Sequence, residues 1–175
     1  MDFFEVVEKR HSYRGAFTAQ PVPKEDIVKM LDAAIRAPSG LNYQPVNFAA
    51  VTDRGKLDAL HALMPRAGMK TAPLVVVVAS RVQKSPRKGI SFEIEDYAAA
   101  TENLLLAITA LGYASVWIDG EVRDEGRAEA IAKLLGLPEG WTVRCVLPVG
   151  VPKTPGKQST KMPLEERVWF VGEPT

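Results

Sequence analysis

The chain has almost none of the side chains that build disulfide frameworks and transition-metal centres. Its 175 residues include one cysteine, Cys145, and two histidines. A single thiol cannot form an intramolecular disulfide, and without a second cysteine a Cys-rich metal site is disfavoured. A lone cysteine in an apolar run fits a reducing compartment. We therefore expect a cytoplasmic protein that holds no metal.

An excess of charge of one sign is also missing. The sequence has 22 Lys and Arg against 21 Asp and Glu, a formal net charge of +1 at pH 7. No overall field would draw such a protein to nucleic acid or to anionic lipid, so any basic site must be local. The stretch from Lys153 to Lys161 is locally basic but has no interleaved aromatics, which argues against nucleic-acid binding.

Long hydrophobic runs are absent too. No apolar run approaches the ~20 residues needed to cross a bilayer, and the opening Met-Asp-Phe-Phe-Glu lacks the basic and apolar regions of a signal peptide. Apolar residues make up 46% of the chain, which suffices for a substantial core at this length. The expectation is a soluble protein with one globular domain over residues 1–175 and no membrane association.

Two phosphate-binding loops are missing, Gly-x-Gly-x-x-Gly after a strand and Gly-Lys-Thr/Ser. Their absence disfavours dinucleotide folds and nucleotide triphosphatases. No persuasive Ser/His/Asp or Cys/His set is present either. His61 falls on a predicted helix face, where a surface role is favoured over that of a catalytic base.

What the chain does have is a pattern of helices and strands without strict βαβ alternation, which indicates an α+β or mixed α/β fold with a sheet wrapped by helices. The run 73–79 is apolar at both alternating sets of positions, so this strand should be buried on both faces. Apolar periodicity, caps and turn residues predict helices over 2–10, 23–37, 53–64, 94–111 and 123–135, and strands over 46–52, 73–79, 114–118 and 142–149. Near the end, the apolar run 168–171 is expected to dock on a sheet edge, either the chain's own or that of a partner subunit.

Two polar segments stand out. Arg10-His11-Ser12-Tyr13-Arg14 follows the first predicted helix and sets two guanidinium groups four residues apart, an arrangement suited to an anion because Arg donors match phosphate oxygens. The alternative is a helix C-terminus that favours cations. The second segment, 37–45, holds Ser39, Asn42 and Gln44 between two prolines, and an ordinary helix-to-strand turn would use the same residue types.

Taken together, the two segments resemble the nitroreductase family of FMN-dependent oxidoreductases. The resemblance continues through the helix around 98–106, the turn 111–113 and the tail segment 163–166. It implies an α+β domain with a central, mostly antiparallel sheet, two copies of which form a homodimer with flavins at the interface and the C-terminal tail on the partner.

Carried onto this sequence, the resemblance implies that Arg10, His11 and Ser12 hold the FMN phosphate and ribityl chain. Arg14 would lie near the pyrimidine edge of the ring. A basic residue two positions before Pro-Leu-Glu contacts the phosphate in the family, which selects Lys161. Ser159 stands where many relatives have a second basic residue, and Lys157 is the possible substitute.

The resemblance also implies that the partner subunit supplies part of each site. Pro38 would lie beside the ring, and Ser39, Asn42 and Gln44 would reach the flavin from the opposite subunit. Backbone N–H groups facing flavin N5 and O4 fall at Ile118, Asp119 and Gly120. Donors there favour hydride acceptance, and a cation near N1 stabilises the charge of the reduced ring. No side chain is expected to act as a nucleophile.

Other residues have competing explanations. Lys70 could approach the flavin pyrimidine, and Trp117 could either line the pocket or lie in the core. Glu93, Glu95 and Asp96 have no His or Cys nearby, so a helix N-terminus is favoured over a metal site.

The implied function is hydride transfer from NADH or NADPH through FMN to nitroaromatics, quinones or similar acceptors in a ping-pong cycle. The connection 81–91 is too short for the helical excursion of larger relatives, so an open pocket with broad acceptor specificity is expected. The alternatives are reductive dehalogenation, flavin destruction, a flavin-storage protein, or an interaction module that merely keeps the fold.

Overall fold

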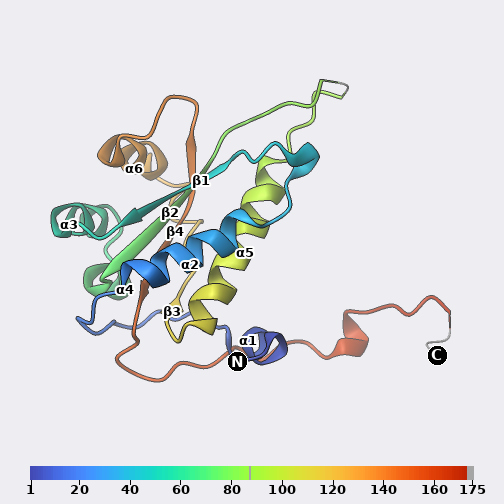
Figure 1. Cartoon of the computed structure of the whole chain (residues 1–175), viewed down its shortest axis with the longest axis horizontal. Helices are drawn as coiled ribbons and strands as arrows, with labels where there is room; N and C mark the ends of the chain where they lie inside the picture. The colour runs from blue at the N-terminus through green and yellow to red at the C-terminus, as the bar shows by residue number, and fades with distance from the viewer. Residues whose placement is uncertain (87, 173–175) are drawn as a thin grey trace.

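The computed structural model describes residues 1–86 and 88–172 and is built on one four-stranded sheet (Figure 1). The spatial order is β1-β2-β4-β3, and every neighbouring pair is antiparallel. The strands are β1 (Val46–Val51), β2 (Leu74–Ser80), β3 (Ala114–Ser115) and β4 (Thr142–Gly150).

Strand β2 lies in the interior of the sheet, and all of its residues are buried. Val75 and Val77 belong to the apolar cluster on one face, whereas Val76 and Val78 belong to the cluster on the other. Successive side chains of a strand point to opposite faces, so a run of valines fills two cores at once. The prediction of a strand buried on both faces is confirmed.

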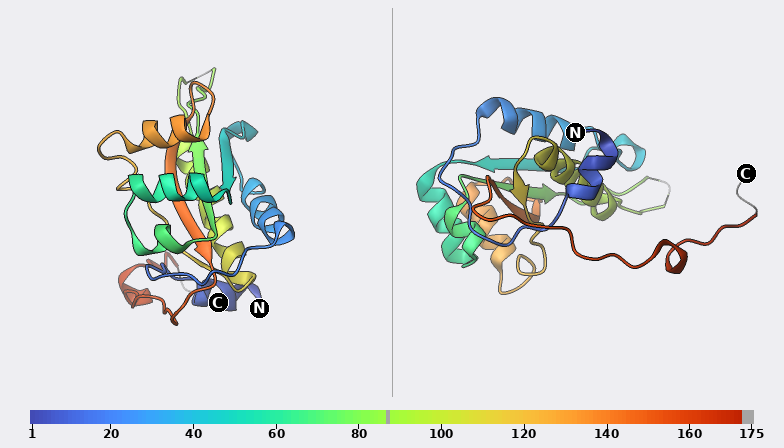
Figure 2. Two further views of the ribbon diagram at one scale, coloured as in Figure 1. Left: turned by 90° about the vertical axis from the view of Figure 1, so that its left-hand side faces the viewer. Right: turned by 90° about the horizontal axis from the view of Figure 1, so that it is seen from below.

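Helices cover both faces of the sheet, which confirms the α+β fold with a helix-wrapped sheet (Figure 2). One face packs against the long helix α5 and against α2, and the other against α3, α4 and α6. The bounds are α2 (Lys24–Ile35), α3 (Arg54–Leu63), α4 (Ala67–Thr71), α5 (Glu93–Ala110) and α6 (Arg127–Leu135).

The first helix, α1 (Phe3–Lys9), begins with the predicted capping box between Asp2 and Glu5. Of its residues only Val6 is buried, while Phe4 is 80% exposed and Phe3 is also exposed. The predicted apolar face is therefore present but largely uncovered in this chain.

Two boundaries differ from prediction, and one helix was not predicted. The strand expected over 114–118 ends at Ser115, and Ile118 forms a separate bridge to Val146. The helix expected from residue 123 starts at Arg127, because Glu125 and Gly126 have positive φ values of 51° and 69°, which a right-handed helix cannot contain. Helix α4 was not predicted, since five residues are too few to show a period.

The C-terminal segment first runs beside the residues that follow α1. Lys153 N donates to Ala16 O at 3.0 Å, and the Gln158 amide donates to Arg10 O at 2.8 Å. After the short helix η2 (Leu164–Glu166), the chain extends away from the body (Figures 1 and 2). Trp169 is 93% exposed, so docking on the chain's own sheet edge was a wrong expectation, whereas docking on a partner stays a prediction. No helix within the described ranges is long and apolar enough to span a membrane.

Candidate functional site

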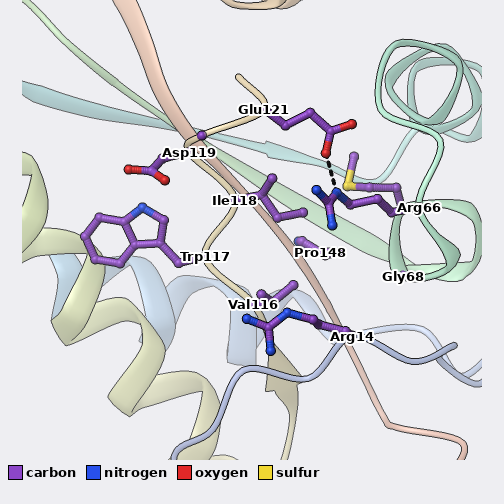
Figure 3. Close-up of a pocket in the computed structure, with 11 residues that line it drawn as sticks. Arg14, Arg66, Gly68, Val116, Trp117, Ile118, Asp119, Glu121 and Pro148 are labelled. Carbon is purple, nitrogen blue, oxygen red and sulfur yellow. Dashed lines mark hydrogen bonds and ion pairs between the residues drawn. The ribbon is translucent and has the colours of Figure 1, made fainter. Parts of the chain in front are cut away.

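An open cavity of about 250 Å³ lies where the segment after β3 passes α4 and the residues that follow α1 (Figure 3). Its floor includes Pro148 of β4. The cavity therefore joins four parts of the chain that are remote in sequence. It is lined by Arg14, Arg66, Gly68, Met69, Val116, Trp117, Ile118, Asp119, Gly120, Glu121 and Pro148.

Arg14 reaches this cavity because Tyr13 fixes the segment beneath it. Tyr13 is buried, its N–H donates to Ser115 O at 2.8 Å, and its hydroxyl donates to Ala16 O at 2.8 Å. In extended backbone the flanking residues point the other way, so Ser12 and Arg14 are exposed. Within the described ranges, the Arg14 guanidinium has no carboxylate partner and donates only to Ser12 O, at 3.3 Å.

The segment after β3 supplies free backbone donors to the cavity wall. Ile118 N–H donates to Val146 O at 3.1 Å, so it is not available to a ligand. By contrast, neither Asp119 N–H nor Gly120 N–H donates to any residue that the structure describes. Two adjacent N–H groups near a guanidinium form a donor set suited to an electron-rich heterocycle edge or an anion. Of the three N–H groups predicted to face the flavin, those of Asp119 and Gly120 are thus without an acceptor in the described ranges.

Trp117 stands at the back of the same wall. Its ring meets Tyr97 edge to face, with 6.0 Å between centroids. It lines the cavity and also packs against the core that includes α5, so the two roles weighed for it from sequence are compatible.

Two charged lining residues were not anticipated. Arg66, just before α4, forms an ion pair with Glu121, which follows the free N–H groups (Figure 3). They are 55 positions apart, and no local pattern connects them. Lys70, which had been considered for the flavin edge, is not among the lining residues.

Below this cavity, Arg10 forms a second basic position. Its side chain is 19% exposed, and its Nε lies 3.5 Å from Oε1 of Glu102 on α5. Burial raises the pKa of Glu102 above its ordinary value, while the positive charges of Arg10 and Lys161 oppose that rise.

His11 faces the C-terminal segment. Its Nδ1 lies 2.9 Å from Lys9 O, and its Nε2 is buried without a partner in the part of the chain described. A Cβ at Gly156 would lie 2.2 Å from that Nε2, so only glycine fits against the ring. His11 therefore contributes to how the tail is held, and its buried Nε2 is left with an unused hydrogen-bonding capacity.

Of the predicted residues in the loop 37–45, Pro38, Ser39 and Gln44 help to line a different cavity, of about 210 Å³, whereas Asn42 is not among its lining residues. Within this chain they do not meet Arg14. The loop includes the short helix η1 (Gly40–Asn42), and Leu41, Asn42 and Gln44 all have positive φ values between 50° and 56°. Their proposed action on a partner's flavin stays a prediction.

Helix α5 holds this loop in its unusual conformation. Asp96, 6% exposed, accepts a hydrogen bond from Gly40 N–H at 2.8 Å. A Cβ on Gly40 would lie 2.3 Å from Cδ2 of Phe92, so glycine is required for the close approach. Glu93 pairs with Arg144 at 3.6 Å. Glu93 and Asp96 at this helix start thus have protein partners, and no group of three or more His, Cys, Asp or Glu in the described ranges could hold a metal.

The family model for the nitroreductase family matches residues 7–66 and 54–151, which include the Arg10–Arg14 segment, the loop 37–45 and the cavity wall. The chain belongs to the nitroreductase family. This family assignment confirms the resemblance seen in the sequence.

Individual relatives agree with the family assignment. The chain is 35% identical over 160 residues to a protein of Methanothermobacter thermautotrophicus named "Putative NADH dehydrogenase/NAD(P)H nitroreductase", covering 89% of this chain and 81% of the relative. A crystal structure of that same name from Bacteroides thetaiotaomicron superimposes with a TM-score of 0.83 at 32% identity, over 95% and 96% of the two chains. A nitroreductase from Bacteroides fragilis, crystallised with bound FMN, gives a TM-score of 0.78 at 26% identity, over 98% and 100%.

The donor set of this nitroreductase-family chain fits FMN. Arg14 and the open N–H groups of Asp119 and Gly120 line the same cavity and could donate to a flavin. Arg10 and Lys161 carry the cations, and the exposed Ser12 the hydroxyl, that a phosphate would require.

Proposed function

We propose that this protein is an FMN-dependent oxidoreductase that takes hydride from NADH or NADPH and delivers reducing equivalents to nitroaromatics, quinones or similar acceptors. The cofactor is FMN. When bound, it supplies the hydride chemistry, and the protein supplies binding, orientation and electrostatics.

The observation that carries this proposal is the combination of Arg14 with two unpaired N–H groups in one cavity. Arg14 is positioned to stabilise negative charge on the ring, because its guanidinium has no carboxylate to neutralise it in the described part of the chain. Asp119 and Gly120 would donate to the ring edge. Donors aimed at the position where negative charge develops on the ring would stabilise that charge.

The phosphate would be held by Arg10, Ser12 and Lys161. Lys161 follows the part of the tail that Gln158 ties to Arg10 O, so the tail delivers this cation to the same side as Arg10. We assign Lys161 rather than Lys157, since Lys161 is the lysine whose charge acts on Glu102 beside Arg10.

We further propose that the working unit is a homodimer, with Ser39, Asn42 and Gln44 of one copy completing the flavin site of the other. Two features support a second copy. These residues lie away from the Arg14 cavity in their own chain, and the apolar side chains of α1 and the tail, among them Phe4 and Trp169, are exposed.

The acceptor pocket is proposed to be open. In the described part of the connection 81–91 there is no helix, only extended and turn residues, so this connection provides no helical cover. Broad acceptor specificity follows, and activity confined to one small acceptor would contradict it.

The deciding experiment is an absorbance spectrum of the purified protein, followed by anaerobic addition of NADH and then NADPH. Flavin bands that bleach would establish the reductive half-reaction, and the faster donor would identify the preferred nicotinamide. Bands that persist with both donors would favour flavin storage. A protein that takes up no FMN would refute the proposal.

The variant Arg10→Ala tests the phosphate contact through the FMN Kd, and Arg54→Ala, on the exposed face of α3, is its control. Losing one charge-assisted phosphate contact costs about 1.5–3 kcal/mol, which corresponds to a rise in the FMN Kd of roughly ten- to hundredfold. Equal FMN affinity in the two variants would favour an interaction module that keeps only the fold.

A further inference from the structure

The ion pair of Arg66 and Glu121 is one of two ion pairs that neutralise charged residues lining the Arg14 cavity. Asp119 pairs with Arg123 at 2.8 Å, and Glu121 pairs with Arg66. Among the lining residues that the structure describes, Arg14 is then the one charge without an ionic partner. With both pairs intact, the unpaired Arg14 leaves the cavity with a net positive charge.

Glu121 is placed to act on whatever lies against the free N–H groups. It follows Gly120 directly, its side chain is 17% exposed, and it lines the cavity. In this partly buried setting a carboxylate without its cation would act more strongly than in water. Arg66 screens it from the opposite wall, at the start of α4 (Figure 3).

The donor-bearing segment has open space at Gly120, where a Cβ would meet nothing within 4 Å. Further contacts come from Arg127, which donates to Leu63 O at 3.0 Å and to Glu121 O at 3.5 Å. Arg127 can thus hold the backbone of Glu121 without help from the Glu121 side chain.

We propose that the Arg66–Glu121 pair is a positioning element that sets the reduction potential of the bound flavin through its charge balance. This inference rests on the proposed function. Two-electron reduction with uptake of one proton from solvent leaves the flavin ring with one negative charge. Neutralising Glu121 exposes the cation of Arg66 and favours that charge, whereas neutralising Arg66 exposes the carboxylate and disfavours it.

The size of the expected change in reduction potential follows from the effect that one charge has on a group 4–6 Å away, a pKa shift of about one to three units. We use the lower end, about one unit, because the Arg66 side chain is 52% exposed to solvent. The ratio of affinities for reduced over oxidised FMN should therefore rise about tenfold in Glu121→Gln and fall about tenfold in Arg66→Gln. For a two-electron couple, each change is about 30 mV.

The test measures the midpoint potential of bound FMN by anaerobic equilibration with a redox dye, in the wild type, both single variants and the double variant. Opposite shifts in the single variants, with a near wild-type value in the double, support the proposal. The pair Arg54→Gln and Asp58→Asn is the matched control, since it removes an exposed ion pair on α3 that does not line the cavity.

Shifts of the same sign in both single variants would overturn the proposal, because they would mean that the pair only keeps the segment in place. Unchanged potentials in protein that bleaches normally with a nicotinamide would overturn it as well, and would leave the proposed function intact. Protein that binds no FMN would overturn the proposed function together with this inference.

Discussion

Replacing Asp96 by alanine tests how helix α5 holds the loop 37–45. The Asp96 carboxylate is buried and accepts Gly40 N–H at 2.8 Å. A hydrogen bond to a charged group contributes about 1.5–3 kcal/mol, and a carboxylate in the first turn of a helix adds about 0.3–1 kcal/mol. Asp96→Ala should therefore lower the free energy of unfolding by about 2–4 kcal/mol. At about 2–4 °C per kcal/mol for a chain of this size, Tm should fall by roughly 4–16 °C.

Glu95→Ala is the matched control. Glu95 lies in the same first turn of α5 but is exposed and makes no bond to Gly40. Glu95→Ala should lower the free energy of unfolding only by the helix-terminus contribution, up to about 1 kcal/mol. Asp96→Asn keeps an acceptor oxygen and should fall between the two alanine variants.

The assay is urea unfolding at fixed protomer concentration, with FMN affinity measured on the same samples. Because Gly40 lies between Ser39 and the residues of positive φ, loosening it should also weaken FMN binding if that loop completes a partner's site. Equal stabilities of Asp96→Ala and Glu95→Ala would refute the account of the loop.

Three further outcomes follow from individual side chains. Burial raises the pKa of Glu102 above its ordinary value of 4.5. An acid whose pKa is higher in the native than in the unfolded state lowers the stability of the native state once the pH is high enough to ionise it. Glu102→Gln should therefore be more stable than the wild type above about pH 5 and equally stable near pH 3, which urea unfolding across pH measures. Burial raises the pKa of Cys145 to about 12, which lowers its thiolate fraction at pH 8 about a thousandfold; a disulfide reagent should label it only after unfolding, and rapid labelling of native protein would contradict its burial. A methyl group at Gly40 would lie 2.3 Å from the Phe92 ring, so Gly40→Ala should destabilise by about 1–3 kcal/mol in thermal unfolding, whereas Gly120→Ala, with nothing within 4 Å, should lose less than half as much.

Elements with strong local signals were predictable from the sequence. The continuous apolar run of β2 could only be an interior strand, and the capping box of Asp2 and Glu5 marks the start of α1. Boundaries failed where backbone conformation decided them. Nothing in the letters around Glu125 shows its φ of 51°, and that angle is what delays α6.

The residues of the site that belong to short motifs were predictable, whereas those that only the fold brings together were not. Arg14, Asp119 and Gly120 were named from the resemblance, and all three line one cavity in the structure. Arg66 and Glu121 were missed because an ion pair across 55 positions leaves no periodicity or spacing to read. The chemical identity of a site can be carried by short motifs, whereas its charge balance depends on residues that only the fold brings together.

The fold divides the tail into two parts that differ in how far a single chain determines their position. Residues up to Gln158 are held by hydrogen bonds to the segment after α1, so their course is set within one chain. Beyond η2, the apolar run that includes Trp169 has no covering surface in the described ranges. Burial of so large an apolar side chain contributes about 1.5–3 kcal/mol or more, and a second copy offers the uncovered face of α1, where Phe4 is exposed. In the proposed homodimer one association would both bury the tail and complete the flavin site, so a variant that exposes the tail, such as Trp169→Ala, should also weaken FMN binding.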